Sequence, residues 1–229
     1  MEILYYSDII YLVSFLIILI AQIFVSTSYS KYKKVLNSKD NTGYDTARKI
    51  LDKNNLEDVI ILETKGNLTD HYDPKRKVIK LSTDIYHGSS IASAAVAAHE
   101  CGHAIQDKNK YIPMRIRSAI VPFVNICTRL GYLAILIGLI FNRAPLLEAG
   151  IILLLAMLVF QLITLPVEFN ASNRALKELE KEKILDKEEK NSARNMLVAA
   201  AFTYVASVLS TLLQIFRLVL ISSSNDRRR

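Results

Sequence analysis

Residues 91–106 read IASAAVAAHECGHAIQ, and this stretch carries the strongest structural signal in the chain. Positions 91–98 are small and apolar, which favours a buried helix. Residues four apart lie on one face of a helix, so His99 and His103 would present their imidazole rings side by side. Glu100 would lie next to them. The stretch therefore predicts a buried helix that carries a polar cluster at one end.

The pentapeptide 99–103 has the form HExxH, in which two histidines on one helix face bind zinc and the glutamate acts as general base. The chain has only four histidines, so this arrangement is rarely an accident. Cys101 would point about 200° away from His99 around the helix, which favours a packing role for it. We predict a metal site here; the alternative is a polar helix face without a metal.

Long apolar runs place the chain among membrane proteins. Hydrophobic residues make up 51% of it, and a helix needs about 17–25 apolar residues to span a bilayer. Four runs approach or reach this length: 9–25, 120–141, 146–167 and 196–221. We predict a mostly α-helical membrane protein with about four transmembrane helices and a small α+β zincin-like portion that includes a short β-sheet or hairpin.

The distribution of charge predicts the orientation of these spans. No Lys or Arg precedes the first run, so it reads as a retained anchor and not as a cleaved signal peptide. Residues 31–118 hold sixteen Lys and Arg and residues 174–194 hold seven, against Arg143 alone between the second and third spans. The positive-inside bias then places both basic segments, and the active site, on the cytoplasmic side of the cell (inner) membrane. The tail Arg227–Arg229 would lie outside, against this bias.

Charge and cysteine content narrow the function classes. The net charge of +7 is explained by topology and by attraction to anionic lipid, and no interleaved basic and aromatic patch suggests nucleic-acid binding. The two cysteines, Cys101 and Cys127, fall in predicted helices, so a disulfide is not expected.

The expected organisation follows from these segments. The predicted parts are transmembrane helix 1 (1–28), a cytoplasmic portion with the HExxH helix (29–118), a transmembrane hairpin (119–167), cytoplasmic helices with the third zinc ligand (168–194), transmembrane helix 4 (195–221) and a basic tail (222–229).

Within the cytoplasmic portion, residues 45–54 resemble an amphipathic helix and residues 59–62 a buried strand. Residues 68–72 and 78–81 flank an Asp-Pro turn signal and predict a β-hairpin or two short edge strands. Residues 77–80 are a candidate edge on which a substrate strand could pair. An ordinary edge protected by lysines is the alternative.

Catalytic zinc usually has three protein ligands. His71, His87 and several carboxylates are candidates for the third. Glu168 is the best of them by position, because it directly follows a predicted span at the membrane face assigned to His99 and His103.

Three segments carry a family resemblance: DHYDP at 70–74, AHECGHAIQ at 98–106 and LPVEFNAS at 165–172. Together they resemble the YugP-type bacterial membrane zinc metallopeptidases over nearly the whole chain. The chain is more distantly similar to the HtpX and CAAX-prenyl-protease type, in which HExxH is followed by Glu-x-x-Ala-Asp. Ser172 stands here in place of that Asp, so a carboxylate that would orient a ligand histidine is not supplied from this position.

The resemblance implies that one zinc ion per chain is bound by His99, His103 and Glu168 and that Glu100 is the base. The implied reaction is hydrolysis of peptide bonds in membrane-associated or misfolded proteins. A non-catalytic, zinc-stabilised membrane scaffold or adaptor is the alternative function. A channel or transporter has little support, because no broken-helix pair or repeat is visible.

Several points stay open from the sequence. The donor that would stabilise the oxyanion is not identified; candidates are His71, Tyr72, Arg174 and Tyr204. The expected partners are a protein or peptide substrate and the lipid bilayer, without nucleic acid. A homo-oligomer or a membrane partner protein is left open.

Overall fold

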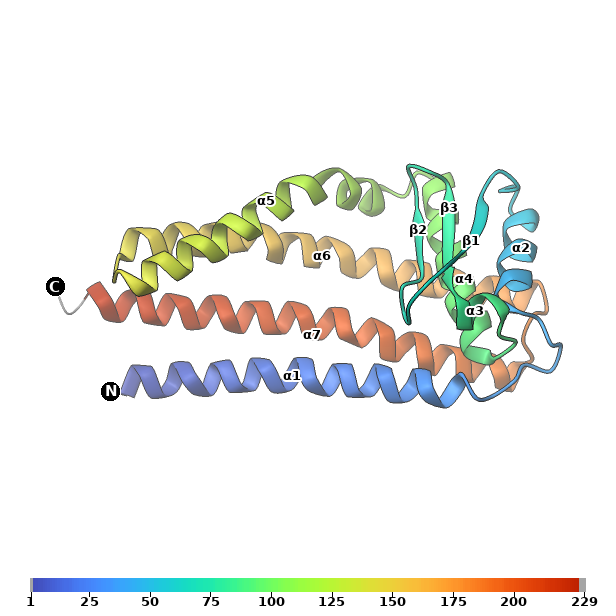
Figure 1. Ribbon diagram of the computed structural model, residues 1–229, viewed down its shortest axis with the longest axis horizontal. Coiled ribbons are helices and arrows are strands. Elements are labelled where there is room, and N and C mark those ends of the chain that lie inside the picture. The colour runs from blue at the N-terminus through green and yellow to red at the C-terminus, as the bar shows by residue number, and fades with distance from the viewer. Residues whose placement is uncertain (1, 227–229) are drawn as a thin grey trace. The chain divides into compact units, whose positions relative to one another are not determined.

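The computed structural model describes residues 2–226, and the rest of the predicted basic tail, 227–229, lies outside them. The protein is a mostly α-helical membrane protein with a small α+β part (Figure 1). The elements in chain order are α1 (Glu2–Tyr32), α2 (Gly43–Lys53), β1 (Ile60–Thr64), β2 (His71–Asp73), β3 (Val78–Ser82), α3 (Thr83–His87), α4 (Ile91–Lys108), α5 (Ile112–Ile140), α6 (Ala144–Lys181) and α7 (Lys187–Asp226).

The chain divides into two compact units that are described separately. The membrane unit comprises Met1–Gln22, Ile116–Leu165 and Thr203–Arg229. The site unit comprises Ile23–Arg115 and Pro166–Phe202. All four long helices, α1, α5, α6 and α7, therefore contribute residues to both units.

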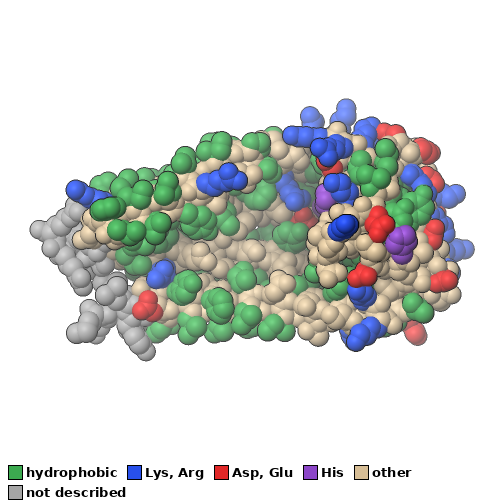
Figure 2. Space-filling view, in the orientation of Figure 1, with side chains coloured by type: hydrophobic (Ala, Val, Ile, Leu, Met, Phe, Trp, Pro, Cys, Tyr) green, Lys and Arg blue, Asp and Glu red, His purple; other side chains and the backbone are tan. Residues whose placement is uncertain are grey.

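Four helices of the described chain are long and apolar enough to cross a membrane, namely α1, α5, α6 and α7. Hydrophobic side chains dominate the membrane unit on the face that Figure 2 shows. Many large apolar residues of this unit are exposed, such as Phe15 on α1 and Phe123 on α5. Lipid covers such surfaces in a membrane protein, so this exposure agrees with a transmembrane bundle.

Helices run on beyond the apolar segments that the sequence singles out. The third apolar run ends at Val167, but α6 continues without a break through Pro166 as far as Lys181. The charged helical stretch predicted after the third span is thus the continuation of the same helix. A proline removes one backbone hydrogen bond and does not by itself end a helix that is held by packing on other elements.

In the site unit a three-stranded sheet has the strand order β1-β3-β2. β2 and β3 pair antiparallel, which confirms the predicted hairpin, and β1 pairs with β3 in parallel. The prediction that residues 77–80 form an edge is wrong, because β3 has a partner on both sides. The edges of the sheet are β1 and β2.

A core of the site unit forms where α2, α4 and the sheet meet. The most deeply buried side chains include Ile50 and Leu51 of α2 and Ile79 and Leu81 of β3. The alanines of α4 are small enough to let α2 pack closely against it, and Ala47 of α2 is also fully buried.

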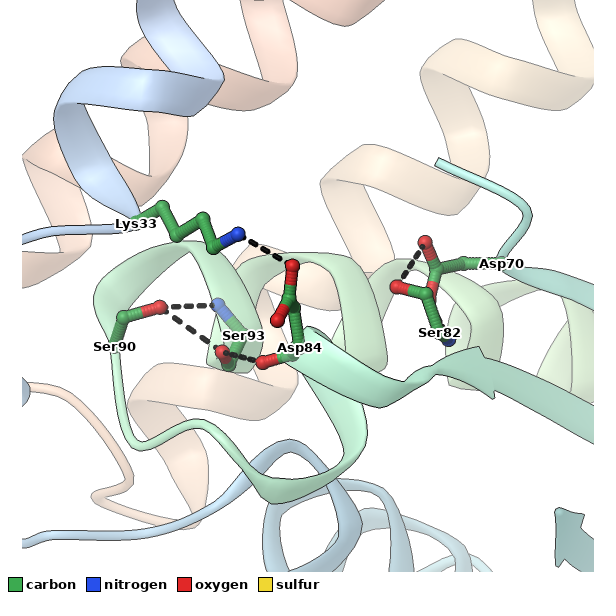
Figure 3. A network of polar contacts seen from close by, with 6 residues as sticks. All are labelled: Lys33, Asp70, Ser82, Asp84, Ser90 and Ser93. Atoms are coloured by element: carbon green, nitrogen blue, oxygen red, sulfur yellow. Dashed lines mark hydrogen bonds and ion pairs between the residues drawn. The ribbon is translucent and has the colours of Figure 1, made fainter. Parts of the chain in front are cut away.

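Polar contacts determine where α4 begins (Figure 3). Ser90 is the N-cap: its hydroxyl accepts a hydrogen bond from the Ser93 backbone N–H at 3.0 Å, which satisfies one of the free donors of the first turn. Lys33, just past α1, forms an ion pair with Asp84 of α3. Nearby, Asp70 accepts hydrogen bonds from the backbone and side chain of Ser82. The start of the HExxH helix is therefore fixed by its own cap and by its neighbours.

Candidate metal centre

The structure brings together His99 and His103 of α4 and Glu168 of α6. The ligand atoms of these three residues lie within 4.8 Å of one another, and they form a group that could hold a metal ion. The Nε2 atoms of His99 and His103 are 3.3 Å and 3.7 Å from the same Glu168 oxygen, Oε2. The two imidazole rings are nearly perpendicular, with centroids 4.8 Å apart.

These separations fit a zinc ion. Zinc binds nitrogen and oxygen at about 2.0–2.2 Å with tetrahedral geometry, which places two ligand atoms roughly 3.4 Å apart. Two imidazoles and one carboxylate also leave a fourth position for a water molecule or a substrate, as catalytic zinc sites do.

The outer nitrogens of both histidines already have partners. His99 Nδ1 lies 3.2 Å from the Ser172 hydroxyl, and His103 Nδ1 lies 3.0 Å from Gln106 Oε1. With the proton on Nδ1, each Nε2 directs a lone pair towards the Glu168 carboxylate. Lone pairs and a carboxylate that converge on one point repel each other unless a cation lies between them, so the donor set itself favours a bound metal.

The pKa of His103 also agrees with a metal ion bound in the cluster. Burial alone would lower the pKa of His103. The nearby carboxylates of Glu168 and Glu100 outweigh burial, and the pKa of His103 is raised above its usual value. The surroundings of His103 thus stabilise positive charge at the point where a metal ion would sit.

Glu100 follows His99 on α4 and is buried, with only 7% of its surface exposed. Within residues 2–226 its carboxylate makes no hydrogen bond or ion pair, although it is near enough to His103 to influence its charge. The Glu100 carboxylate is thus buried beside the three donors and is not hydrogen-bonded to another described residue. This is the position that a general base needs.

Cys101 is not part of the cluster. It is fully buried on the side of α4 that faces α2, and its Sγ lies 3.6 Å from the Ala47 carbonyl oxygen. Burial raises the pKa of this thiol well above its ordinary value. The predicted packing role agrees with this position.

Of the other predicted site residues in the site unit, Ser172 touches a ligand histidine, whereas His71, His87 and Arg174 have other partners. The His71 ring contacts the Thr69 carbonyl at 2.8 Å, and His87 faces Glu63 at 3.3 Å, so neither joins the cluster. Arg174 donates to Asn170 Oδ1 at 2.7 Å.

Tyr72 also lies outside the cluster. The Tyr72 hydroxyl donates to Asp107 Oδ2 at 2.9 Å. Burial and this carboxylate raise the pKa of Tyr72 far above its usual range, so it stays a neutral donor. Tyr204 belongs to the membrane unit.

Two residues of the centre do not stand out from sequence alone. Gln106 is fully buried beside His103, and Gly102 lies against the backbone of Ala171 in α6. The available signal for Gln106 was a polar residue three positions after His103, on the helix face that carries both histidines.

Comparison with known proteins points the same way. A curated relative, "Putative membrane protease YugP" from Bacillus subtilis (strain 168), is 45% identical over 201 residues, which cover 88% of this chain and 89% of the relative. No solved structure matches the chain. A family model described as "Putative neutral zinc metallopeptidase" matches residues 7–223, and the chain, with its HExxH helix and its His–His–Glu cluster, belongs to this zinc metallopeptidase family.

Proposed function

We propose that this protein is a membrane-embedded, zinc-dependent endopeptidase that hydrolyses peptide bonds of membrane-associated or misfolded proteins. One zinc ion per chain would be held by His99, His103 and Glu168. The observation that carries the proposal is the convergence of these three donors beside the buried Glu100. The basic segments of the chain support a site on the cytoplasmic side of the cell membrane.

Zinc, when bound, supplies Lewis acidity that polarises the scissile carbonyl and acidifies water. Glu100 takes a proton from the attacking water and passes it to the leaving amine. Its burial strengthens this role, because few solvent molecules compete for the carboxylate. Ser172 and Gln106 hold the two imidazoles so that their Nε2 atoms face the site.

The sheet suggests how a peptide would be held. β2 is an edge strand, and Tyr72 connects it to α4 through Asp107. An extended substrate could add to the free side of β2 through main-chain hydrogen bonds, which tolerate varied sequences. This places the substrate strand next to the helix that carries Glu100.

Purified wild type and Glu100→Gln provide the main test. Both are expected to bind one zinc ion, and only the wild type is expected to cleave an unfolded test protein. Glu57→Gln, at an exposed position of the same unit, is the matched control and should retain cleavage. Absence of cleavage in the wild type, with zinc bound, would support a zinc-stabilised scaffold instead.

A further inference from the structure

Gln106 connects a metal-binding histidine to the second helix of the centre. The side chain is completely buried. Its oxygen faces His103 Nδ1 at 3.0 Å, while its nitrogen donates to the Val167 carbonyl at 2.8 Å and to Asn170 Oδ1 at 3.0 Å. Val167 directly precedes Glu168, so one amide contacts a ligand on α4 and the backbone beside a ligand on α6.

All the donors of this amide are used. A glutamine side chain offers two N–H donors and one carbonyl acceptor. Here both donors reach α6 and the acceptor reaches His103. A glutamate at this position would lack the donors, and a methionine would lack all three groups, so the contacts select an amide.

Arg174, at the end of this network farthest from His103, determines which atom of each amide donates and which accepts. The Arg174 guanidinium can only donate, and its Nε lies 2.7 Å from Asn170 Oδ1. That atom is therefore the oxygen of Asn170, and the Gln106 atom 3.0 Å from it must be the nitrogen. The Gln106 oxygen then faces His103, whose Nδ1 must carry the proton.

We propose that Gln106 is a positioning residue, which holds His103 in the Nδ1–H tautomer with Nε2 towards the metal and keeps Glu168 at a fixed distance across the helix interface. Asn170 and Arg174 determine the orientation of the Gln106 amide. The inference rests on the proposed zinc site. It adds that a hydrogen-bond network of the Gln106 and Asn170 amides and the Arg174 guanidinium sets the geometry of this site.

The test measures zinc affinity of the full-length protein in detergent by competition with a chelator, without any peptide substrate. Gln106→Met is expected to weaken zinc binding by about 10–100-fold, as is usual when the partner of a ligand histidine is lost. Gln106→Glu keeps an acceptor for His103 but loses both donors to α6, so it should also bind zinc more weakly than wild type. With Co²⁺ in place of zinc, both variants should show altered visible absorption, because the ligand geometry changes.

Ser93→Ala is the matched control, because Ser93 is also buried on α4 but its hydroxyl contacts Ser90 at the start of the helix and the Asp84 carbonyl of α3. It should lower the melting temperature and leave zinc affinity and the Co²⁺ spectrum unchanged. If Gln106→Met fails to fold, the zinc affinity and the Co²⁺ spectrum of Gln106→Glu and Asn170→Ala test the inference instead. Wild-type affinity and spectrum in a folded Gln106 variant would overturn the inference and leave the proposed function intact. No zinc binding by wild type would overturn both.

Discussion

Gly102 of α4 lies directly against the backbone of Ala171 of α6. A Cβ atom added at Gly102 would be 2.5 Å from the Ala171 carbonyl oxygen, closer than real side chains approach. The same two helices carry the three candidate metal ligands, so the absence of a side chain at position 102 sets how near the ligands can come to each other.

Gly102→Ala is therefore expected to push α4 and α6 apart. Overpacking of this kind costs about 1–3 kcal/mol of stability, and zinc affinity and cleavage should both fall. Ala104→Gly is the control, because it destabilises the same helix by roughly 1 kcal/mol without pressing on α6. Zinc affinity should survive in the control; equal affinity in both variants would contradict a spacing role for Gly102.

Removal of the metal should destabilise the protein. A ligand that binds only the folded state stabilises it by about 2.7 kcal/mol at a free concentration 100 times its Kd. Chelation should therefore lower the melting temperature in detergent, and added zinc should restore it. For His99→Ala and for Glu168→Ala, the melting temperature of each variant should be the same with and without zinc. A zinc-dependent shift that persists in both variants would place the metal elsewhere.

The hydrogen bond from Tyr72 to Asp107 should matter for peptide binding more than for metal binding. Tyr72→Phe removes a bond of about 0.5–1.5 kcal/mol, which corresponds to a rise in KM of roughly 2–10-fold, because β2 is no longer held against α4. The zinc content should not change. Tyr44→Phe, a tyrosine of the same unit in contact with the Tyr86 ring, should leave KM unchanged. An unaltered KM in Tyr72→Phe would argue against β2 as the substrate edge.

Asp70 should make stability depend on pH. Burial, the largest cause, raises its pKa above the ordinary value although Ser82 donates to it. A carboxyl whose folded pKa is raised stabilises the folded state fully below its unfolded pKa of about 3.9. This stabilisation is lost as the pH rises through the pKa that the carboxyl has in the folded protein. The melting temperature of wild type relative to Asp70→Asn should therefore fall as the pH rises above about 4.

The pKa of Asp58 is shifted in the opposite direction from that of Asp70. Its hydrogen bond with Lys77 lowers the pKa of this exposed carboxyl, so any contribution is present above its unfolded pKa and is lost as the pH falls. The melting temperature of wild type relative to Asp58→Asn should therefore rise slightly with pH, or not change, because this carboxyl is exposed. A wild-type advantage over Asp70→Asn that does not vary with pH would contradict the Asp70 prediction.

The sequence allowed much of the fold to be predicted, because its main signals are local. Apolar length identifies the four long helices, and the spacing of His99 and His103 predicts their common face. The Asp73-Pro74 turn likewise predicts the β2–β3 hairpin. Each of these depends on residues within a few turns of one another.

The features that were missed depend on contacts between distant segments. The parallel pairing of β1 with β3, which makes β3 central, depends on the path of the segment between them, which contains β2, and leaves no local pattern. The role of Gln106 becomes visible only when Val167 and Asn170, more than sixty positions later, are placed beside it. Glu168 was assigned by its position after an apolar run and by resemblance, since a lone glutamate has no distinguishing spacing.

The continuity of α6 affects the order in which the centre is made during synthesis. Glu168 lies on the same unbroken helix as the third apolar span, 65 residues after His103. A nascent chain that ends before this residue contains the HExxH helix but only two of the three donors. The ribosome must therefore synthesise α5 and the apolar part of α6 before the donor set exists, and translation itself delays the assembly of the centre until these two segments have been made.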